Sequence, residues 1–334
     1  MHEAVEPRNE IGSLIAAIYA PIRDELREVE QILDTELRSD AAEVHPMVRH
    51  CATMGGKQLR PALVLLTAKA AGRVQREHLV VAAVVEMIHT ATLVHDDVLD
   101  DATIRRHRPT ANAAWDNKAS ILLGDFLFTH AFYLASTLDS TYACRTIGRS
   151  TNMVCEGELR QIATQGCLGV SEADYLEVIG AKTAELCACC CRLGAHYAAA
   201  ETSRVEALAD YGHKFGVAFQ ITDDLLDMLG DERAVGKSLG TDLEQLKPTL
   251  PLIRLLEQLD ATERKRVIAA LEAVDADRKS IVATWLDRTD ALQYTRQRAI
   301  GFVEQAREQL RGLPASEARD VLHGLCDFVI DRNA

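Results

Sequence analysis

The stretch LVVAAVVEMIHTATLVHDDVLDD, residues 79–101, is apolar for most of its length and ends abruptly in aspartates. An apolar stretch of this length without strand-like alternation predicts a helix, and without a broadly polar face it should be central in the fold. Asp96 and Asp100 share one helix face at the C-terminal end, where the helix dipole is already negative. Asp97 and Asp101 add to the repulsion. Such an end predicts a bound cation.

The sequence FQITDDLLD, residues 219–227, repeats this arrangement, because Asp223 and Asp227 are also one turn apart after an apolar segment. Ligands that are all oxygen favour Mg²⁺, which a few carboxylates hold while its open positions bridge to phosphate oxygens. For either motif alone, a solvated acidic helix tip is the alternative. Two such motifs, both flanked by apolar residues, favour a metal site.

Cationic residues complement the acidic motifs. GGKQLRP, residues 55–61, puts Lys57 and Arg60 beside a glycine turn at a helix start, where N–H groups and the dipole favour an anion. Arg105 and Arg106 follow the first acidic motif, and arginine binds diphosphate with a rigid fork of donors. Further basic residues near glycine or proline breaks are Lys182, Lys237 and Lys247.

His89 lies seven positions before Asp96 on the same helical stripe, so it faces either this site or the core. Together these features describe a pocket for two diphosphates, one held through Mg²⁺ and one held directly by cations. An apolar interior lies beneath it. The substrates are therefore expected to be diphosphates with apolar tails.

No strand pattern lasts long enough for a sheet, so we predict one all-α domain over residues 1–334. The longer predicted helices cover residues 14–37, 43–56, 62–71, 79–101, 119–138, 144–165, 172–200 and 203–229. Shorter charged helices follow, broken by Pro248, Pro251 and Pro314.

Composition excludes several classes of protein. The 334 residues carry a net charge of −13, which argues against a nucleic-acid binder. The hydrophobic fraction of 48% is enough for a full core, so a disordered chain is excluded. No apolar run approaches the ~18 residues of a membrane span. The acidic N-terminus is unlike a signal peptide, so we expect a cytoplasmic protein.

Four of the nine cysteines cluster in one predicted helix: Cys187, Cys189, Cys190 and Cys191. They fit small apolar core residues in a reduced protein. Their helical spacing also allows a metal site, although no second Cys/His cluster completes a tetrahedral one.

From about Gly55 to Pro251 the chain resembles the trans-isoprenyl diphosphate synthases, the polyprenyl synthetase family. The resemblance is carried by GGKQLRP, HTATLVHDDVLDD with its following arginine pair, Lys182-Thr183, FQITDDLLD and GKSLGTDLEQLKPTLP. Within the family, HTATLVHDD and LLGDFLFTHAF are most similar to the long-chain members that make octaprenyl diphosphate. The resemblance implies an all-α isoprenoid synthase bundle around a central catalytic cavity. Such proteins are usually homodimers that add isopentenyl diphosphate to an allylic diphosphate.

The resemblance also implies roles for individual residues. Two to three Mg²⁺ ions would be bound by Asp96, Asp97, Asp100, Asp223 and Asp227. The allylic diphosphate would be gripped by Arg105, Lys182, Lys237 and Lys247. Isopentenyl diphosphate would be held by Lys57, Arg60, His89 and Arg106. Thr183 and Gln220 would face the developing cation.

Product length is expected to depend on the apolar space below the first acidic motif. Ala91 and Thr92 lie about one turn below Asp96, where short-chain members commonly place an aromatic floor, and here both are small. Deeper candidates for the floor are Phe126, Phe128 and Phe132. We therefore predict a long product, about C40 by resemblance, whose release would involve a transient membrane contact.

Three other functions compete with this interpretation. A class I terpene cyclase binds one diphosphate and needs no second anion site, which Lys57, Arg60 and His89 supply here. A non-catalytic subunit of a heteromeric prenyl synthase would be expected to lose aspartates or arginines. A shorter-chain synthase of farnesyl or geranylgeranyl diphosphate shares the motifs, so only product length separates it.

Overall fold

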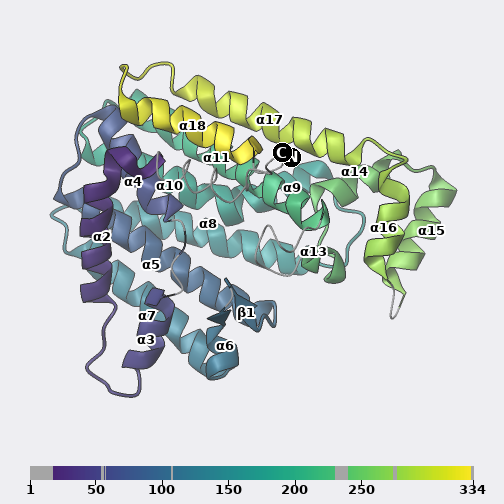
Figure 1. The fold of residues 1–334 in the computed structure, drawn as a ribbon, viewed down its shortest axis with the longest axis horizontal. Helices are drawn as coiled ribbons and strands as arrows, with labels where there is room; N and C mark the ends of the chain where they lie inside the picture. The colour runs from purple at the N-terminus through teal and green to yellow at the C-terminus, as the bar shows by residue number, and fades with distance from the viewer. Residues whose placement is uncertain are drawn as a thin grey trace, which may run out of the picture. The chain divides into compact units, whose positions relative to one another are not determined.

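The computed structural model describes residues 18–53, 56, 58–106, 108–229, 240–273 and 277–331. These residues are almost entirely helical, which confirms the predicted all-α class (Figure 1). In chain order the elements are η1 (Ala20–Ile22), α2 (Arg23–Glu36), α3 (His45–Thr53), α4 (Leu59–Ala71), α5 (Arg76–Leu99), β1 (Ile104–Arg105), β2 (Arg108–Pro109), α6 (Ala111–Ala114), α7 (Asn117–Ser136), α8 (Tyr142–Thr164), α9 (Glu172–Ile179), η2 (Gly180–Ala184), α10 (Glu185–Tyr197), α11 (Thr202–Leu229), α13 (Thr241–Glu244), α14 (Leu250–Gln258), α15 (Ala261–Glu272), α16 (Arg278–Leu286), α17 (Ala291–Gln309) and α18 (Glu317–Asp331).

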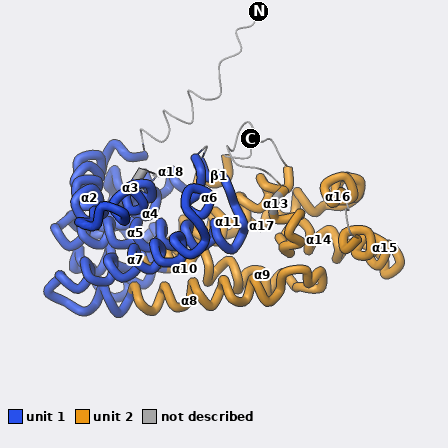
Figure 2. Tube along the Cα trace, turned by 90° about the horizontal axis from the view of Figure 1, so that it is seen from below, with its two compact units in different colours: residues 1–146, 190–209, 310–325 blue, residues 147–189, 210–309, 326–334 orange. Residues whose placement is uncertain are grey.

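The chain forms two compact units, coloured blue and orange in Figure 2. Unit 1 comprises Met1–Thr146, Cys190–Ala209 and Leu310–Leu325. Unit 2 comprises Ile147–Cys189, Asp210–Gln309 and Cys326–Ala334. Each unit gathers segments that are far apart in the sequence. The first acidic motif belongs to unit 1 and the second to unit 2.

In unit 1, α5 is the central helix, packed against α2, α4 and α7 (Figure 1). The run 80–85 is buried around the whole circumference of the helix, as the continuous apolar sequence predicts. The α10 part of unit 1 comes very close to α4. A Cβ on Gly194 would lie 2.1 Å from Thr67 Oγ1, so only glycine fits at that position.

Two helices correct the expectation about membrane spans. By length and composition alone, an 18-residue window in each of the helices α5 and α7 is apolar enough to cross a membrane. The expectation was wrong because such a window tolerates isolated charged residues, such as Glu86, that break an uninterrupted apolar run. In α5, 61% of the window is buried inside the protein, as its central position in unit 1 requires.

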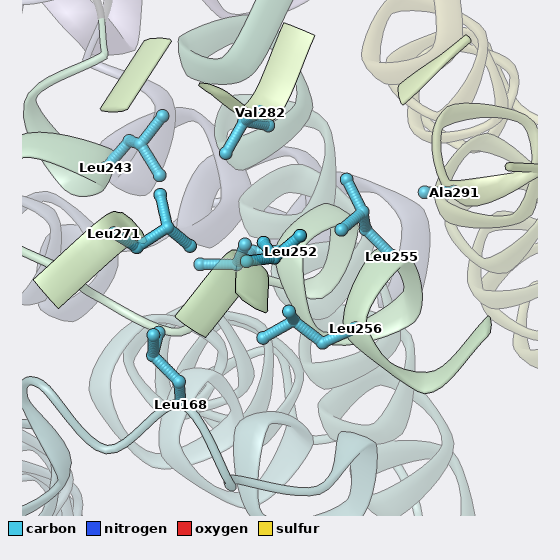
Figure 3. Packing of buried hydrophobic residues seen from close by; sticks show 9 residues of the cluster. Leu168, Leu243, Leu252, Leu255, Leu256, Leu271, Val282 and Ala291 are labelled. Atoms are coloured by element: carbon cyan, nitrogen blue, oxygen red, sulfur yellow. The ribbon is translucent and has the colours of Figure 1, made fainter. Parts of the chain in front are cut away.

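In unit 2, α14 supplies the middle of an apolar cluster (Figure 3). Leu252, Leu255 and Leu256 are spaced to form one helical stripe, and each is at most 2% exposed. They pack with Leu168, Leu243, Val267, Leu271, Val282 and Ala291. This cluster joins α13, α15 and α16 to α14, and α14 also packs on α9 and α17.

Two predicted helices are interrupted. In the first, Pro21 lies in the short 3-10 turn η1, and residues 14–17 are outside the described part of the chain. In the second, 172–200, a π-helical turn (η2) separates α9 from α10, and Glu185 N donates to the Gly180 carbonyl. The π turn faces a close approach of α8, since a Cβ on Gly157 would lie 2.7 Å from Lys182 N.

Candidate functional site

The first acidic motif occupies the last turn of α5. Asp96 and Asp100 are half-buried and share one helix face, as predicted. Asp97 is fully buried, and Arg105 Nε donates to its Oδ1 over 2.7 Å. The structure therefore separates the three predicted metal ligands into an outer pair and a buried aspartate that forms an ion pair.

A short hairpin returns the arginines to the end of α5. Strands β1 and β2 pair antiparallel, and Arg106 adopts a left-handed backbone (φ 52°) between them. After the hairpin, Thr110 Oγ1 donates to the Ala102 carbonyl over 2.7 Å, and Asn112 Nδ2 donates to the same oxygen over 3.0 Å. These bonds fix the loop that carries Arg105 and Arg106.

The side chain of Asp97 is shielded from water. Burial raises the pKa of Asp97, and the positive charge of Arg105 opposes this rise. Burial also raises the pKa of the Cys51 thiol to about 12, with a further contribution from the charge of Asp97. The guanidinium of Arg105 is therefore the main charge that compensates a carboxylate in this buried position.

Arg60 and Arg106 form a basic cluster at the start of α4. Gln58, the residue immediately before α4, has a left-handed backbone (φ 49°), and its side chain does not cap the helix. The N–H donors of this helix start favour an anion. The guanidinium of Arg106 packs on Gly56, where a Cβ would lie 2.5 Å from it. A glycine at this turn is therefore required for Arg106 to come close.

Two α5 side chains complete this cluster. Burial lowers the pKa of His89 well below its usual value, and the charges of Arg60 and Arg106 lower it further. His89 is therefore neutral at neutral pH. Glu86 lies three positions earlier; burial raises its pKa, while the same two arginines lower it. Glu86 is thus a buried carboxyl group beside the two arginines.

The second acidic motif lies near the end of α11 in unit 2. Asp223 is half-buried, whereas Asp227 is only 4% exposed. The Asp227 carboxylate accepts from Asp242 N over 3.3 Å, and its carbonyl accepts from Gly240 N over 3.1 Å. Lys247 Nζ lies 3.7 Å from Asp242 Oδ1. Asp227 therefore holds the segment that brings Lys247 toward this helix end.

Asp224, the middle aspartate, is turned away from its neighbours and buried. Its carboxyl accepts from Tyr175 OH over 2.6 Å and from Gln220 Nε2 over 2.7 Å. Gln220 Oε1 in turn accepts from Thr183 Oγ1 over 2.9 Å, so the two residues expected beside the cation are in contact. Burial raises the pKa of Asp224 to about 8, and the charge of Asp242 adds to the rise.

Lys182 lies on the π turn next to Thr183. Its Nζ is 2.5 Å from Glu158 Oε2 and donates to Gln161 Oε1 over 2.7 Å. Both partners come from α8, and Lys182 and Glu158 are about three-quarters buried. The predicted phosphate-binding lysine is therefore already oriented by a carboxylate and an amide of the protein.

The other predicted residues are placed as follows. Lys57 and Lys237 lie outside the described residues. Ala91 is fully buried, while Thr92 and the predicted floor residues Phe126, Phe128 and Phe132 are half-buried. The four clustered cysteines are all buried. Within the described part of the chain, no three His, Cys, Asp or Glu side chains form a metal-binding group by themselves.

Sequence reasoning missed Glu86, Glu158, Tyr175 and the role of Asp224. For Glu86 a signal exists, because it is the one charged residue in the apolar run 79–94 and precedes His89 by three positions. Glu158 and Tyr175 give no such signal. Their contacts depend on how α8, α9 and α11 pack, which local sequence does not encode.

Comparisons with known proteins agree with these motifs. Residues 41–286 match a family model described as Polyprenyl synthetase. The all-trans-nonaprenyl-diphosphate synthase (geranyl-diphosphate specific) of Rhodobacter capsulatus is 36% identical over 316 residues, covering 94% of this chain and 97% of that protein. The octaprenyl diphosphate synthase of Escherichia coli is 35% identical over 301 residues, covering 89% and 93%.

Solved structures agree as well. A polyprenyl synthase of Caulobacter crescentus, complexed with calcium and isoprenyl diphosphate, is 35% identical and superposes with a TM-score of 0.89, covering 96% of this chain and 98% of that one. Proteins named for shorter products are also similar, so similarity alone does not fix the number of isoprene units.

Replacing Arg105 with Gln should lower the free energy of unfolding by about 3 kcal/mol, because the Asp97 carboxylate loses its buried cation. Without Arg105 the folded-state pKa of Asp97 rises further, so the folded protein binds a proton more tightly than the unfolded chain. The loss should therefore be largest near about pH 8 and shrink toward about pH 5. Urea unfolding across this range measures it.

The matched control is Arg160→Gln, because Arg160 and Glu177 form an ion pair that is exposed at both ends. It should change the unfolding free energy by less than about 0.5 kcal/mol. Equal losses in the two variants, or a loss in Arg105→Gln that grows on acidification, would contradict the assignment.

Proposed function

This chain belongs to the polyprenyl synthetase family, and on that premise we propose that it extends an allylic diphosphate with isopentenyl diphosphate to about octaprenyl length. It is a prenyltransferase of the long-chain polyprenyl diphosphate type. One observation carries the proposal. In both acidic motifs the first and last aspartates lie one turn apart, while the middle aspartate engages a side chain from another element.

The residues present fit a divalent metal ion, on which this family depends. The donors are all carboxylate oxygens, and Mg²⁺ takes one or two carboxylates together with water and substrate phosphate rather than a complete protein cage. We infer two or three ions, held by Asp96 and Asp100 in unit 1 and by Asp223 and Asp227 in unit 2. Asp97, also a predicted ligand, engages Arg105. Bound Mg²⁺ would neutralise the charge of the leaving diphosphate.

The allylic diphosphate is the substrate assigned by the family resemblance to Arg105, Lys182, Lys237 and Lys247. Arg105, Lys182 and Lys247 each lie beside a protein carboxylate, at 2.7, 2.5 and 3.7 Å. These carboxylates hold the cations in place before substrate arrives, which lowers the ordering cost of binding.

Isopentenyl diphosphate is assigned to the basic cluster of unit 1. Arg60, Arg106 and the start of α4 supply donors for its diphosphate. His89 is neutral beside them, so one ring nitrogen can donate to phosphate while the other accepts. Lys57 belongs to the same set by the family resemblance.

The reaction follows from this arrangement. The allylic C–O bond breaks, and its electron pair leaves with the diphosphate. Thr183 and Gln220 present oxygens to the allylic cation, and the double bond of isopentenyl diphosphate attacks it to form the new C–C bond. A proton then passes to the released diphosphate. The apolar surroundings keep water away from the cation.

Product length is assigned to the space between α5 and α7. His95 Nε2 lies 3.1 Å from the Ile121 carbonyl, and its ring stacks on Phe128, which joins the end of α5 to the first half of α7. The two helices pack along each other, and the end of α5 lies beside the first half of α7, so they run antiparallel. Thr92 lies one turn before His95 on α5. It is therefore opposite the turn of α7 that follows Phe128 and leads to Phe132. This register supports Thr92 as a wall and Phe132 as a floor.

Homodimerisation belongs to the same proposal. On α7, Leu122 and Tyr133 lie on one stripe and are 68% and 63% exposed, and exposed apolar side chains of this size mark interaction surfaces. Sedimentation equilibrium should give twice the chain mass of 36.7 kDa, and a single-chain mass would contradict the dimer. The long apolar tail of the product also favours a transient membrane contact during release.

Asp96→Asn should lower incorporation of labelled isopentenyl diphosphate by about 100-fold or more, because the outer carboxylate pair loses a metal ligand. The protein should stay folded, and its unfolding free energy should rise by a few tenths of a kcal/mol, since a like-charge pair is removed. Asp101→Asn is the matched control. Asp101 is exposed with a left-handed backbone (φ 50°) that asparagine adopts easily. Equal activity in the two variants would overturn the metal assignment.

Thr92→Phe should shorten the product by at least one isoprene unit, measured by sizing the lipids after incubation with several allylic starters. Thr92 is a better probe than Ala91, because Ala91 has no exposed surface and a large residue there would overpack the core. Thr35→Phe is the control, since Thr35 is an exposed helical threonine of α2. Unchanged product length in Thr92→Phe would place the wall elsewhere.

A further inference from the structure

A chain of hydrogen bonds in unit 2 extends behind Thr183 and Gln220 to two buried residues. Thr183 Oγ1 donates to Gln220 Oε1, and Gln220 Nε2 donates to Asp224 Oδ1. Tyr175 OH lies 2.6 Å from the other oxygen, Asp224 Oδ2. Tyr175 and Asp224 are 4% and 6% exposed, so this part of the chain is shielded from water.

The π turn is what allows both ends of this chain to meet α11. Tyr175 and Thr183 are eight positions apart, which in a regular α-helix would turn them about 80° away from each other. The turn η2 adds one residue between them and brings them back to one face. On α11, Gln220 and Asp224 are one turn apart and face them. Tyr175 is therefore opposite Asp224, and Thr183 is opposite Gln220.

We propose that Asp224 and Tyr175 are positioning residues that fix the side-chain amide of Gln220, so that its oxygen and that of Thr183 face the reacting carbon. This inference rests on the proposed function. An amide can rotate by half a turn at little cost unless its partners distinguish oxygen from nitrogen. The acceptor Asp224 Oδ1 makes that distinction, because it requires the NH₂ group. A flipped amide would present N–H to a carbocation and destabilise it.

The orientation does not depend on whether Asp224 carries a proton. A tyrosine hydroxyl can both donate and accept, so the bond between Tyr175 and Oδ2 forms in either state. Oδ1 then stays an acceptor for Gln220. Asparagine in place of Asp224 can make the same two bonds, with its oxygen toward Gln220 and its NH₂ toward Tyr175. A metal ligand, by contrast, needs the carboxylate charge.

This difference defines the test. Asp224→Ala should lower kcat by about 10- to 100-fold, with little change in the KM of either diphosphate or in the Mg²⁺ concentration required. Asp224→Asn should keep at least about a third of the wild-type kcat. In a Gln220→Ala background, adding Asp224→Ala should cost less than about threefold more, because Asp224 acts through Gln220.

Tyr175→Phe is a milder variant that does not depend on Asp224→Ala folding, and it should lower kcat by about threefold or more. Its matched control is Tyr294→Phe, because Tyr294 OH also donates to a carboxylate, Glu172 Oε2, over 2.6 Å. That control should leave kcat unchanged.

Three results would overturn the inference while wild-type turnover stays intact. Asp224→Ala could keep the full wild-type kcat. Alternatively, it could lower kcat by the same factor in the Gln220→Ala background as in the wild-type protein. Asp224→Asn could lose activity together with a higher Mg²⁺ requirement, as a metal ligand would. If instead the wild-type protein incorporated no isopentenyl diphosphate, the proposed function itself would fail, and this inference with it.

Discussion

Two carboxylates one turn apart at the C-terminal end of a buried helix repel each other and the helix dipole, and the rest of this structure depends on that repulsion. On a helix, one such pair costs a few tenths of a kcal/mol. The protein does not add the middle aspartate of each motif to this repulsion, because that side chain binds protein partners instead. Asp97 is buried against Arg105, and Asp224 is buried against Tyr175 and Gln220. A divalent cation bound to the outer aspartates would relieve the repulsion between them.

The same principle extends to the cations. Lys182 lies against Glu158, Lys247 lies near Asp242, and Arg60 and Arg106 lie near Glu86. Each of these described cations thus lies near a carboxylate of its own unit before any diphosphate binds. Diphosphate would exchange for these partners rather than order a mobile side chain. The cations are therefore preorganised, but diphosphate must displace their carboxylate partners in order to bind.

Much of the fold could be predicted because hydrophobic periodicity and Gly/Pro punctuation are local properties. The α5 and α11 helices begin and end close to their predicted limits, and both acidic motifs lie where the apolar runs stop. The π turn could not be predicted, because it lies where α8 meets a distant segment at Gly157. The partners of Asp97 and Asp224 also come from other elements. Spacing predicted which aspartates share a face, and tertiary contacts decided what the middle ones do.

The central claim is that the outer aspartates of each motif hold divalent ions that bind diphosphate. A crystal structure with Mg²⁺ and a non-cleavable allylic diphosphate analogue tests it most directly. The account predicts Mg²⁺ that is bound to diphosphate oxygens and ligated by Asp96 and Asp100 in unit 1, and likewise Mg²⁺ ligated by Asp223 and Asp227 in unit 2. Bound diphosphate and Mg²⁺ with no metal on either one of these aspartate pairs would contradict it.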